Sequence, residues 1–182
     1  MSKYEKKITD LNIIGRDPGK HAALLGDAHE LIVAGILIRL GFEVGQLSAK
    51  GGAYDLWVIA FSDPSLKEIR PLRVQVKTIS KGKSVKFIGG VRAGIDREYK
   101  SEVKKYKYTT EHNDMIVGVD VETLDLYLIP TRFIAKWGES KSISKLQLLK
   151  NNWDILLNWN DEFLNDLEKK ILSRSRYGRP NF

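Results

Sequence analysis

Four polar side chains occupy positions at which they could act together on a phosphodiester: Glu30, Asp55, Gln75 and Lys77. Asp55 opens the apolar segment "DLWVIAF", and Gln75 and Lys77 alternate with valines in "RVQVKT". Such alternation is typical of a half-buried strand with one apolar and one polar face. If the two segments pair antiparallel through "DPSLKEIRP", Gln75 and Lys77 lie beside Asp55 on one face. The sequence therefore predicts a carboxylate, an amide and an amine in one cluster.

This set of groups matches magnesium-dependent phosphodiester hydrolysis. A carboxylate and further oxygens hold the ion, which lowers the pKa of an attacking water, and a nearby ammonium orients that water or offsets developing charge. Gln75 supplies a neutral oxygen, so the site carries one negative charge fewer than a pair of carboxylates. Glu30, within the apolar run "AHELIVAGILIRL", could restore the missing carboxylate.

The residue counts restrict the metal. The chain has no cysteine, and its three histidines, His21, His29 and His112, lack the spacing of a zinc site. Oxygen ligands select a hard ion, so we expect Mg²⁺, with Mn²⁺ able to substitute. Each candidate also has a plain structural alternative: Asp55 as a turn residue, Lys77 as a strand-edge lysine and Glu30 on a solvent-facing helix surface.

The elements that must position these groups can be outlined. Asp17 and Pro18 form a helix cap and first turn, and a helix is expected from there to about Leu40, with Gly41 as its terminator. One face of this helix carries Leu24, Leu31 and Ile38. Its partly apolar surface suits packing on a sheet, with Glu30 at the sheet's edge.

Strand candidates follow the helix, and a helical segment ends the chain. "FEV", "YDLWVIAF", "LRVQVKTI", "SVKFIGG", "MIVGVDV" and "DLYLIP" are the expected strands, the last two forming a hairpin through "ETL". The stretch from about Ile143 to Leu172 is expected to be helical, with five candidate packing residues, Trp153, Leu156, Leu157, Phe163 and Leu164. The order α, then β, then α predicts a mixed α+β (α/β) fold.

Composition sets the broad class. The chain has 182 residues, of which 42% are hydrophobic and 29% charged, a composition typical of one globular domain with a small appendage. We expect residues 1–140 to form the core domain and residues 141–182 to form a C-terminal helix and basic tail. No uninterrupted apolar run approaches the roughly 20 residues of a membrane span, and "MSKYEKKITD" lacks the apolar centre of a signal peptide. We therefore expect a cytoplasmic protein with no membrane partner.

The net charge of +7 favours a polyanionic partner such as DNA, although a solvated basic face is the simpler alternative. The residues expected to neutralise backbone phosphates are Lys81, Lys83, Lys86, Arg92, Lys104, Lys105, Arg174 and Arg176. Tyrosines 99, 106 and 108 stand among these bases, where they either stack on splayed bases or pack against the sheet.

Taken together, "GDAHE", "LIRLGFEV", "YDLWV", "VQVKT" and "NDMIVGVDVETLDLYLIP" resemble the PD-(D/E)xK nuclease superfamily, and especially its restriction-like and intron-homing branch with a "QVKT" motif. The resemblance covers roughly residues 20 to 135. It implies a restriction-endonuclease-like core, a central mixed sheet flanked by helices, and a metal-dependent DNA endonuclease. In that pattern Glu30, Asp55 and Gln75 are the metal ligands and Lys77 is the catalytic lysine.

The sequence departs from the superfamily pattern at two positions. Tyr54 replaces the proline before the aspartate, and Gln75 replaces an acidic residue. The second change leaves open a catalytically inactive, DNA-binding nuclease fold. The segment "GFEVGQLSAKGGAYDL", with Ser48 in its loop, is also similar to archaeal Holliday-junction resolvases, which implies structure-specific cleavage. Cleavage of both strands usually takes two active sites, so we expect a homodimer or higher homo-oligomer, with Trp153 and Trp159 as interface or core residues.

Overall fold

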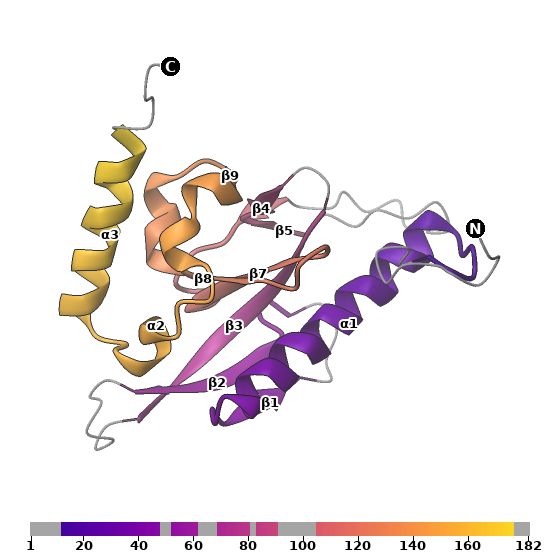
Figure 1. Ribbon diagram of the computed structural model, residues 1–182, viewed down its shortest axis with the longest axis horizontal. Helices are drawn as coiled ribbons and strands as arrows, with labels where there is room; N and C mark the ends of the chain where they lie inside the picture. Colours follow the sequence, from indigo (N-terminus) through magenta and orange to yellow (C-terminus); the bar gives the residue numbers. More distant parts are fainter. Residues whose placement is uncertain (1–11, 48–51, 62–68, 81–82, 91–104, 177–182) are drawn as a thin grey trace.

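A computed structural model describes residues 12–47, 52–61, 69–80, 83–90 and 105–176, with the side chains of 174–176 outside that description. Its centre is a five-stranded sheet in the order β1-β2-β3-β7-β8, and Figure 1 shows four of these strands labelled around the long β3. The strands are β1 (Val44–Gln46), β2 (Leu56–Phe61), β3 (Ile69–Ile79), β7 (Met115–Asp120) and β8 (Leu126–Pro130). Only β3 and β7 pair in parallel, so the sheet is mixed.

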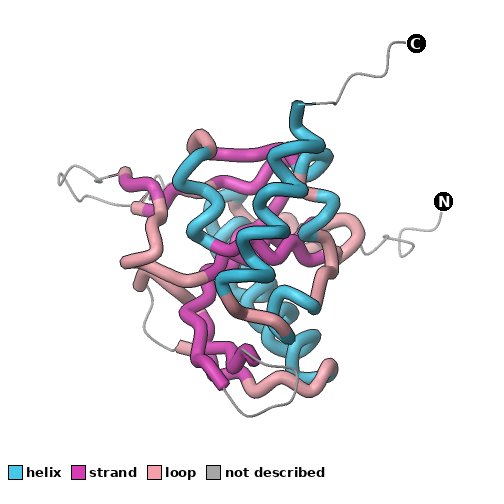
Figure 2. Tube along the Cα trace, turned by 90° about the vertical axis from the view of Figure 1, so that its left-hand side faces the viewer, coloured by secondary structure: helices cyan, strands magenta, loops and turns pink. Residues whose placement is uncertain are grey.

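Helices flank this sheet on both sides. In Figure 1, α1 (Pro18–Arg39) runs along one side of the sheet and α3 (Asp161–Arg176) stands on the other. Figure 2 views the molecule from the α3 side, where helical segments lie in front of the strands. The expected mixed α+β architecture, a central mixed sheet between helices, is therefore confirmed.

The ends of α1 follow from local chemistry. Asp17 Oδ1 accepts hydrogen bonds from the backbone N–H groups of Gly19 (2.9 Å) and Lys20 (3.2 Å), which otherwise have no partner in the first turn. After the helix, Gly41 adopts a φ of +94°, a conformation that side chains disfavour and glycine accepts. Both predicted signals are confirmed.

The inward face of α1 is not the face that Leu24, Leu31 and Ile38 share. The residues that α1 buries are His29, Val33, Ala34 and Leu37, and α1 packs mainly against β3. Nearly every turn of α1 carries apolar side chains on more than one side, so periodicity alone does not select the buried face.

By length and composition α1 could also cross a membrane, and it is the one such helix among the described residues. The sequence did not indicate this, because it has no uninterrupted apolar run of roughly 20 residues. Only 17% of its most apolar window is buried. Length and composition are weak evidence, because the core helix of a water-soluble domain passes the same test.

The alternation of β2 matches the prediction, whereas on β3 the polar Gln75 is buried together with its neighbours Val74 and Val76. Leu56, Val58 and Ala60 of β2 are fully buried, and so are Leu72 and Val74 of β3. Strands β7 and β8 are buried on both faces, β8 included although it is the last strand in the sheet order. They form the predicted antiparallel hairpin.

The segment "SVKFIGG" does not join the central sheet. It divides into β4 (Ser84–Lys86) and β5 (Ile88–Gly89), which pair with β9 (Ser140–Ser142) and β6 (Tyr106–Lys107). The β4–β9 ribbon contacts β3, and Figure 1 shows β4 and β5 near one end of that strand.

The stretch predicted as one helix from about Ile143 is broken into short pieces. It contains 3₁₀ turns at Ile143–Lys145 and Gln147–Leu149, a four-residue helix α2 (Asp154–Leu157), and then α3; a further 3₁₀ helix, Thr131–Lys136, precedes it. An asparagine lies at one of the breaks. Asn151 has a φ of +47°, and its Oδ1 accepts from the backbone N–H of Leu126 at 2.8 Å, a bond that competes with helix formation.

The predicted packing residues of this region are mostly correct. Leu156 and Leu164 are buried, Trp153 and Phe163 pack partly buried against the core, and Leu157 is exposed, which corrects that assignment. Trp159 is buried in the same core, so it is a packing residue of the single chain.

Candidate active site

The β2–β3 pairing brings Asp55 beside Gln75. Leu56 faces Val74 in an antiparallel register, and the backbone N–H of Asp55 donates to the carbonyl of Val74 at 2.8 Å. Asp55 therefore stands at the start of β2, level with Gln75 on β3. The antiparallel arrangement that the sequence predicted is confirmed.

Hydrogen bonds join the two side chains directly. Asp55 Oδ2 accepts from the backbone N–H of Val76 at 2.7 Å and from Gln75 Nε2 in a short contact. Gln75 Oε1 accepts from the hydroxyl of Tyr108 at 3.2 Å. Gln75 is only 6% exposed, so its amide is held between a carboxylate and a phenol, away from bulk water.

Burial dominates the electrostatics of the cluster. It raises the pKa of Asp55, against the opposing effects of the Val76 N–H and the charge of Lys77. It also lowers the pKa of Lys77, although the negative charges of Asp55 and Glu30 favour the ammonium. The amine lies 4.9 Å from the centre of the Tyr108 ring, and burial raises the pKa of that phenol, which stays protonated.

Helix α1 brings the fourth group. His29 is buried, and its Nδ1 lies 2.8 Å from Thr78 Oγ1, a side-chain hydrogen bond between α1 and β3. Burial lowers the pKa of His29, which favours the neutral imidazole in the folded protein. The next residue, Glu30, acts electrostatically on Lys77. The four predicted site residues thus come from α1, β2 and β3 and belong to one electrostatic cluster.

Two supporting contacts hold the strand ends at this cluster. Asn113 is fully buried; its Nδ2 donates to the carbonyl of Ala53 at 3.0 Å, and its Oδ1 accepts from Thr131 Oγ1 at 2.5 Å. Arg73 binds the Asp114 carboxylate through Nε at 3.1 Å. Both contacts tie the loop that precedes β7 to β2 or β3.

Three residues at the site, Tyr108, His29 and Asn113, were not predicted from the sequence. Tyr108 stood out only as an aromatic among basic residues, for which packing against the sheet was one of two interpretations, and its burial confirms packing. No local pattern signals its contact with Gln75, because the two lie 33 residues apart.

The oxygen donors of the cluster suit a hard divalent cation. Two carboxylates, Asp55 and Glu30, and the amide carbonyl of Gln75 are ligands that Mg²⁺ accepts. Within the described ranges no three His, Cys, Asp or Glu side chains gather as a metal-holding group, so an ion would depend on the amide. That amide now turns Nε2 toward Asp55; half a rotation exchanges Nε2 and Oε1, and the Tyr108 hydroxyl can accept as well as donate.

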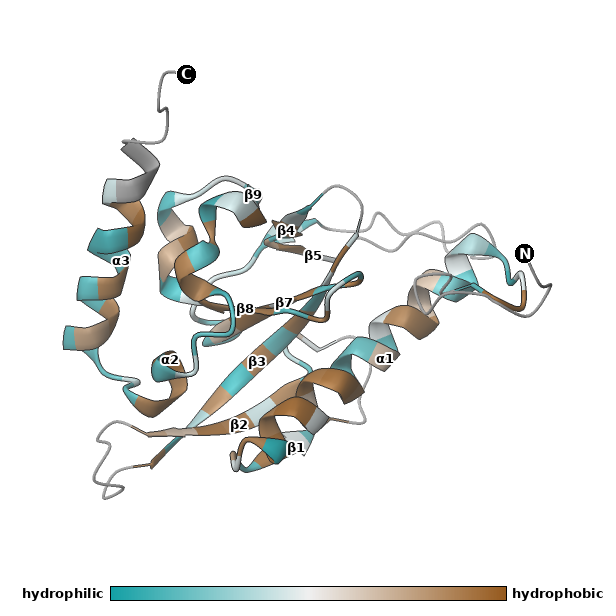
Figure 3. Cartoon of the chain, in the orientation of Figure 1, coloured by the Kyte–Doolittle hydropathy of each residue, from teal (hydrophilic) through white to brown (hydrophobic). Residues whose placement is uncertain are grey.

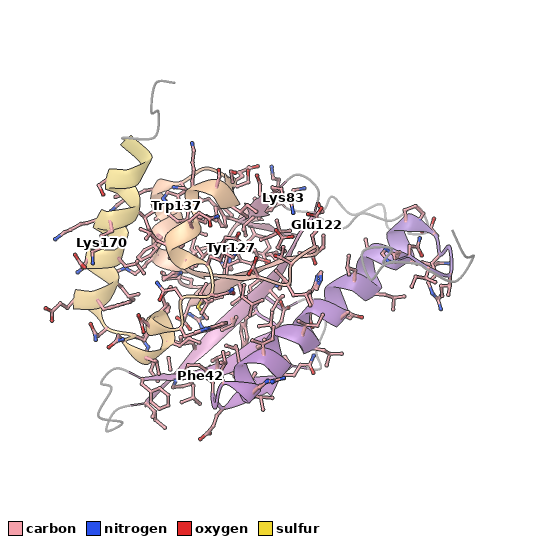
Figure 4. All side chains as sticks on the ribbon, viewed as in Figure 1. Phe42, Lys83, Glu122, Tyr127, Trp137 and Lys170 are labelled. Atoms are coloured by element: carbon pink, nitrogen blue, oxygen red, sulfur yellow. The ribbon has the colours of Figure 1, made fainter. Side chains whose placement is uncertain are left out.

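The predicted DNA-contacting residues are placed unevenly. Lys83 donates to Asp120 (3.2 Å) and Glu122 (2.7 Å), and Figure 4 labels Lys83 and Glu122 close together at the end of β3. Lys105 pairs with Glu139 at 2.5 Å, and Lys86 is exposed on β4. Lys81, Arg92 and Lys104 lie outside the described residues, as does Ser48, and so do the side chains of Arg174 and Arg176.

Basic residues absent from the prediction stand on the same ribbons. Lys107 donates to the carbonyl of Trp137, and Lys141 places its amine 3.7 Å from the centre of the Trp137 ring. Burial and the nearby charge of Lys145 lower the pKa of Lys141.

The matches of this chain to known proteins are structural ones. No protein-family model matches the chain, and no curated protein matches it. Among solved structures, a bacterial homing endonuclease, I-Ssp6803I, aligns over 65% of this chain and 75% of its own, with 19% sequence identity and a TM-score of 0.46. Similarity at this level establishes neither a common activity nor membership of a family.

Proposed function

We propose that this chain is a divalent-metal-dependent DNA endonuclease that hydrolyses phosphodiester bonds. One observation carries the proposal: two neighbouring strands and one helix bring Asp55, Gln75, Lys77 and Glu30 into a single, largely buried cluster. Two carboxylates beside a buried amine are costly for folding and supply the groups that metal-assisted hydrolysis requires.

Each residue has a role that its surroundings support. Asp55, Glu30 and the Gln75 carbonyl would hold Mg²⁺ or Mn²⁺, which when bound polarises the scissile phosphate and acidifies water. Lys77, with its pKa lowered by burial, is closer to giving and taking a proton than a surface lysine. It would orient the attacking water and receive its proton.

The substrate class follows from charge. The net charge of +7 draws the chain to a polyanion, and the exposed Lys86 lies on a ribbon beside the end of β3. Lysines near the cluster would bind backbone phosphates on either side of the scissile bond. Such contacts position DNA without reading its sequence.

One observation favours a second candidate, a DNA-binding protein that has lost catalysis. Gln75 Nε2 donates to Asp55 Oδ2, so the amide group occupies the position that a cation bound to that oxygen would need. If that hydrogen bond is too stable to exchange, the fold binds DNA and does not cut it.

Plasmid cleavage in Mg²⁺ or Mn²⁺ tests the proposal. We expect wild-type protein to nick or linearise DNA, Asp55→Asn and Lys77→Met to reduce the rate at least about 100-fold, and chelation to abolish it. Asp154→Asn, which changes an exposed carboxylate on α2, is the matched control and should cut normally.

Fluorescence anisotropy with labelled DNA separates the two candidates. Binding without cleavage in wild type and both site variants would overturn the enzyme and support the binding protein. Titration calorimetry adds a readout independent of turnover: Mn²⁺ should bind wild type, and Asp55→Asn should weaken it at least about tenfold.

A further inference from the structure

The hydroxyl of Tyr108 lies against the active-site cluster, where it contacts Gln75. Tyr108 directly follows β6 and is 4% exposed, and Gln75 is 6% exposed, so the contact between them is buried. Figure 3 shows hydrophilic colouring at intervals along β3, the strand that carries Gln75. A buried amide needs protein partners for both its oxygen and its nitrogen. The groups around Gln75 therefore decide which end of its amide faces Asp55.

The acceptors beside Gln75 hold its amide in one orientation. Gln75 Nε2 donates to Asp55 Oδ2 and, at 3.3 Å, to the carbonyl oxygen of Val76. An amide oxygen in the same place would face two other oxygens. At the other end of the amide, Gln75 Oε1 accepts from the Tyr108 hydroxyl at 3.2 Å. This arrangement turns the nitrogen toward Asp55, whereas a ligand of a hard cation would turn its oxygen there.

We propose that Tyr108 is a positioning residue of the active site, and that its hydroxyl and that of Tyr106 together let the Gln75 amide turn Oε1 toward a divalent cation. A hydroxyl can donate or accept, so Tyr108 can hold either end of the amide. After half a rotation Gln75 Nε2 would donate to the Tyr108 oxygen. The Tyr108 proton would then need a new acceptor. This role rests on the proposed metal-dependent function.

Tyr106 supplies that acceptor. The rings of Tyr106 and Tyr108 meet edge to face with centroids 5.4 Å apart, and a side-chain hydrogen bond joins the two phenols. Burial, together with the nearby Tyr106 and Asp55, raises the pKa of Tyr108, so the phenol keeps its proton in both arrangements. Its hydroxyl donates to Gln75 Oε1 in one arrangement and to the Tyr106 oxygen in the other.

Gly89 permits the two hydroxyls to lie close together. It pairs with Tyr106 across the β5–β6 ribbon. A β-carbon built on Gly89 would lie 2.7 Å from the Tyr106 hydroxyl oxygen and 2.9 Å from that of Tyr108, closer than real β-carbons come to such atoms. The ring of His112 stacks on Tyr106 with centroids 4.8 Å apart. Packing therefore fixes the place of both hydroxyls.

The two tyrosine hydroxyls differ in when they are needed. Before the amide turns, Tyr108 donates to Gln75 without help from Tyr106. After the turn, the Tyr108 proton depends on the Tyr106 oxygen. Loss of the Tyr106 hydroxyl should therefore weaken cation binding and change the metal-free fold little. The Tyr108 ring also lies 4.9 Å from the Lys77 amine, a contact that a change at Tyr106 leaves in place.

Nuclear magnetic resonance with Mg²⁺ follows the amide directly. Mg²⁺ is diamagnetic, so nuclear Overhauser effects from the Gln75 Nε2 protons can be compared before and after saturation. The N–H of Val76 shares Asp55 Oδ2 with Nε2, so the metal-free protein should show the strongest effect to the Val76 amide proton. With Mg²⁺ it should move to the Tyr108 ring protons. Mg²⁺ binding without that move would overturn the proposed role of Tyr108.

Titration calorimetry with Mn²⁺ tests Tyr106. We expect Tyr106→Phe to weaken Mn²⁺ binding at least about fivefold, because a buried hydroxyl is left without an acceptor. Without metal, this variant should melt within about 4 °C of wild type. Tyr127→Phe is the matched control, since Tyr127 is 2% exposed on β8, which β7 separates from β3. Its Mn²⁺ affinity should equal that of wild type. Equal affinity of Tyr106→Phe and wild type would overturn the role of the two hydroxyls.

The results distinguish this role from the nuclease activity. If Mn²⁺ binds wild type and Tyr106→Phe equally, the role of the tyrosines fails and metal-dependent cleavage stands. If the amide turns and Tyr106→Phe binds Mn²⁺ weakly, but wild type leaves plasmid intact, the nuclease activity fails and the role of the tyrosines stands. Failure of wild type to bind either cation would overturn both.

Discussion

Replacing Gln75 by glutamate tests whether the amide lies against Asp55. In the wild type Gln75 Nε2 donates to the Asp55 carboxylate at a nearly buried position. Gln75→Glu removes that donor and sets a second carboxylate beside the first. Loss of a hydrogen bond to a charged group costs about 1.5–3 kcal/mol, and repulsion between buried carboxylates adds to it, so we expect a loss of about 3 kcal/mol at pH 8 without metal.

The loss of stability caused by Gln75→Glu should grow as pH rises. About 3 kcal/mol corresponds to a folded-state pKa of the introduced glutamate roughly two units above the unfolded value of about 4.3, near 6.5. The folded state then binds the proton more tightly than the unfolded state, so stability falls as pH rises from about 4.3 to 6.5. Below this window the protonated carboxyl can donate to Asp55, as the amide does, and the loss should nearly vanish.

Thermal unfolding at pH 4.5 and pH 8 measures the effect. For a chain of this size the variant should melt about 6–12 °C below wild type at pH 8 without metal. Mn²⁺ should recover part of the difference, because the added carboxylate binds the ion more tightly than the wild-type amide does and each tenfold gain in affinity adds about 1.4 kcal/mol to the variant relative to wild type. Gln75→Met is the control, since it removes the amide without adding charge and its deficit should not vary with pH.

The refuting result is equally definite. If Gln75→Glu and Gln75→Met show the same deficit at both pH values, Gln75 does not contact Asp55 in the folded protein. The same melting curves with Mn²⁺ report on the metal site separately: a larger Mn²⁺-induced rise in Gln75→Glu than in wild type is expected, because the site gains a negative ligand.

Three further substitutions probe the surroundings of the site. Because burial raises the pKa of Asp55, wild type should lose stability relative to Asp55→Asn as pH rises above about 4, so calorimetry should find the Tm of the variant to rise relative to that of wild type between about pH 4 and pH 8; a constant difference would contradict this. Tyr108→Phe leaves Gln75 Oε1 without its donor and should lower the free energy of unfolding in urea by about 1–3 kcal/mol, whereas an unchanged midpoint would show the hydroxyl contact to be unimportant. Gly118→Ala places a β-carbon 2.9 Å from Val85 Cγ2 and should cost about 1–3 kcal/mol, which a second substitution, Val85→Ala, should partly recover.

Elements and pairings set by neighbours in the chain were predictable from the sequence. The cap at Asp17 and the terminator at Gly41 act within one turn, and strand alternation depends on residues two apart. The adjacency of Asp55 and Gln75 followed because an antiparallel neighbour reached by a short connection fixes the register between them. One point at which the helical prediction beyond Ile143 failed is Asn151, whose side chain bonds to the backbone of Leu126, 25 residues away.

The sequence by itself determined which groups could do chemistry: a carboxylate, an amide and a lysine at alternating strand positions, and a glutamate on the helix. Tertiary structure alone decided what surrounds them. Tyr108, directly after β6, donates a hydrogen bond to Gln75, and no local sequence pattern predicts this contact. Burial in the folded chain is the main cause of the pKa shifts of Asp55 and Lys77. The sequence likewise did not determine the buried side of α1, since apolar residues surround that helix and its contact with β3 decides which of them are buried.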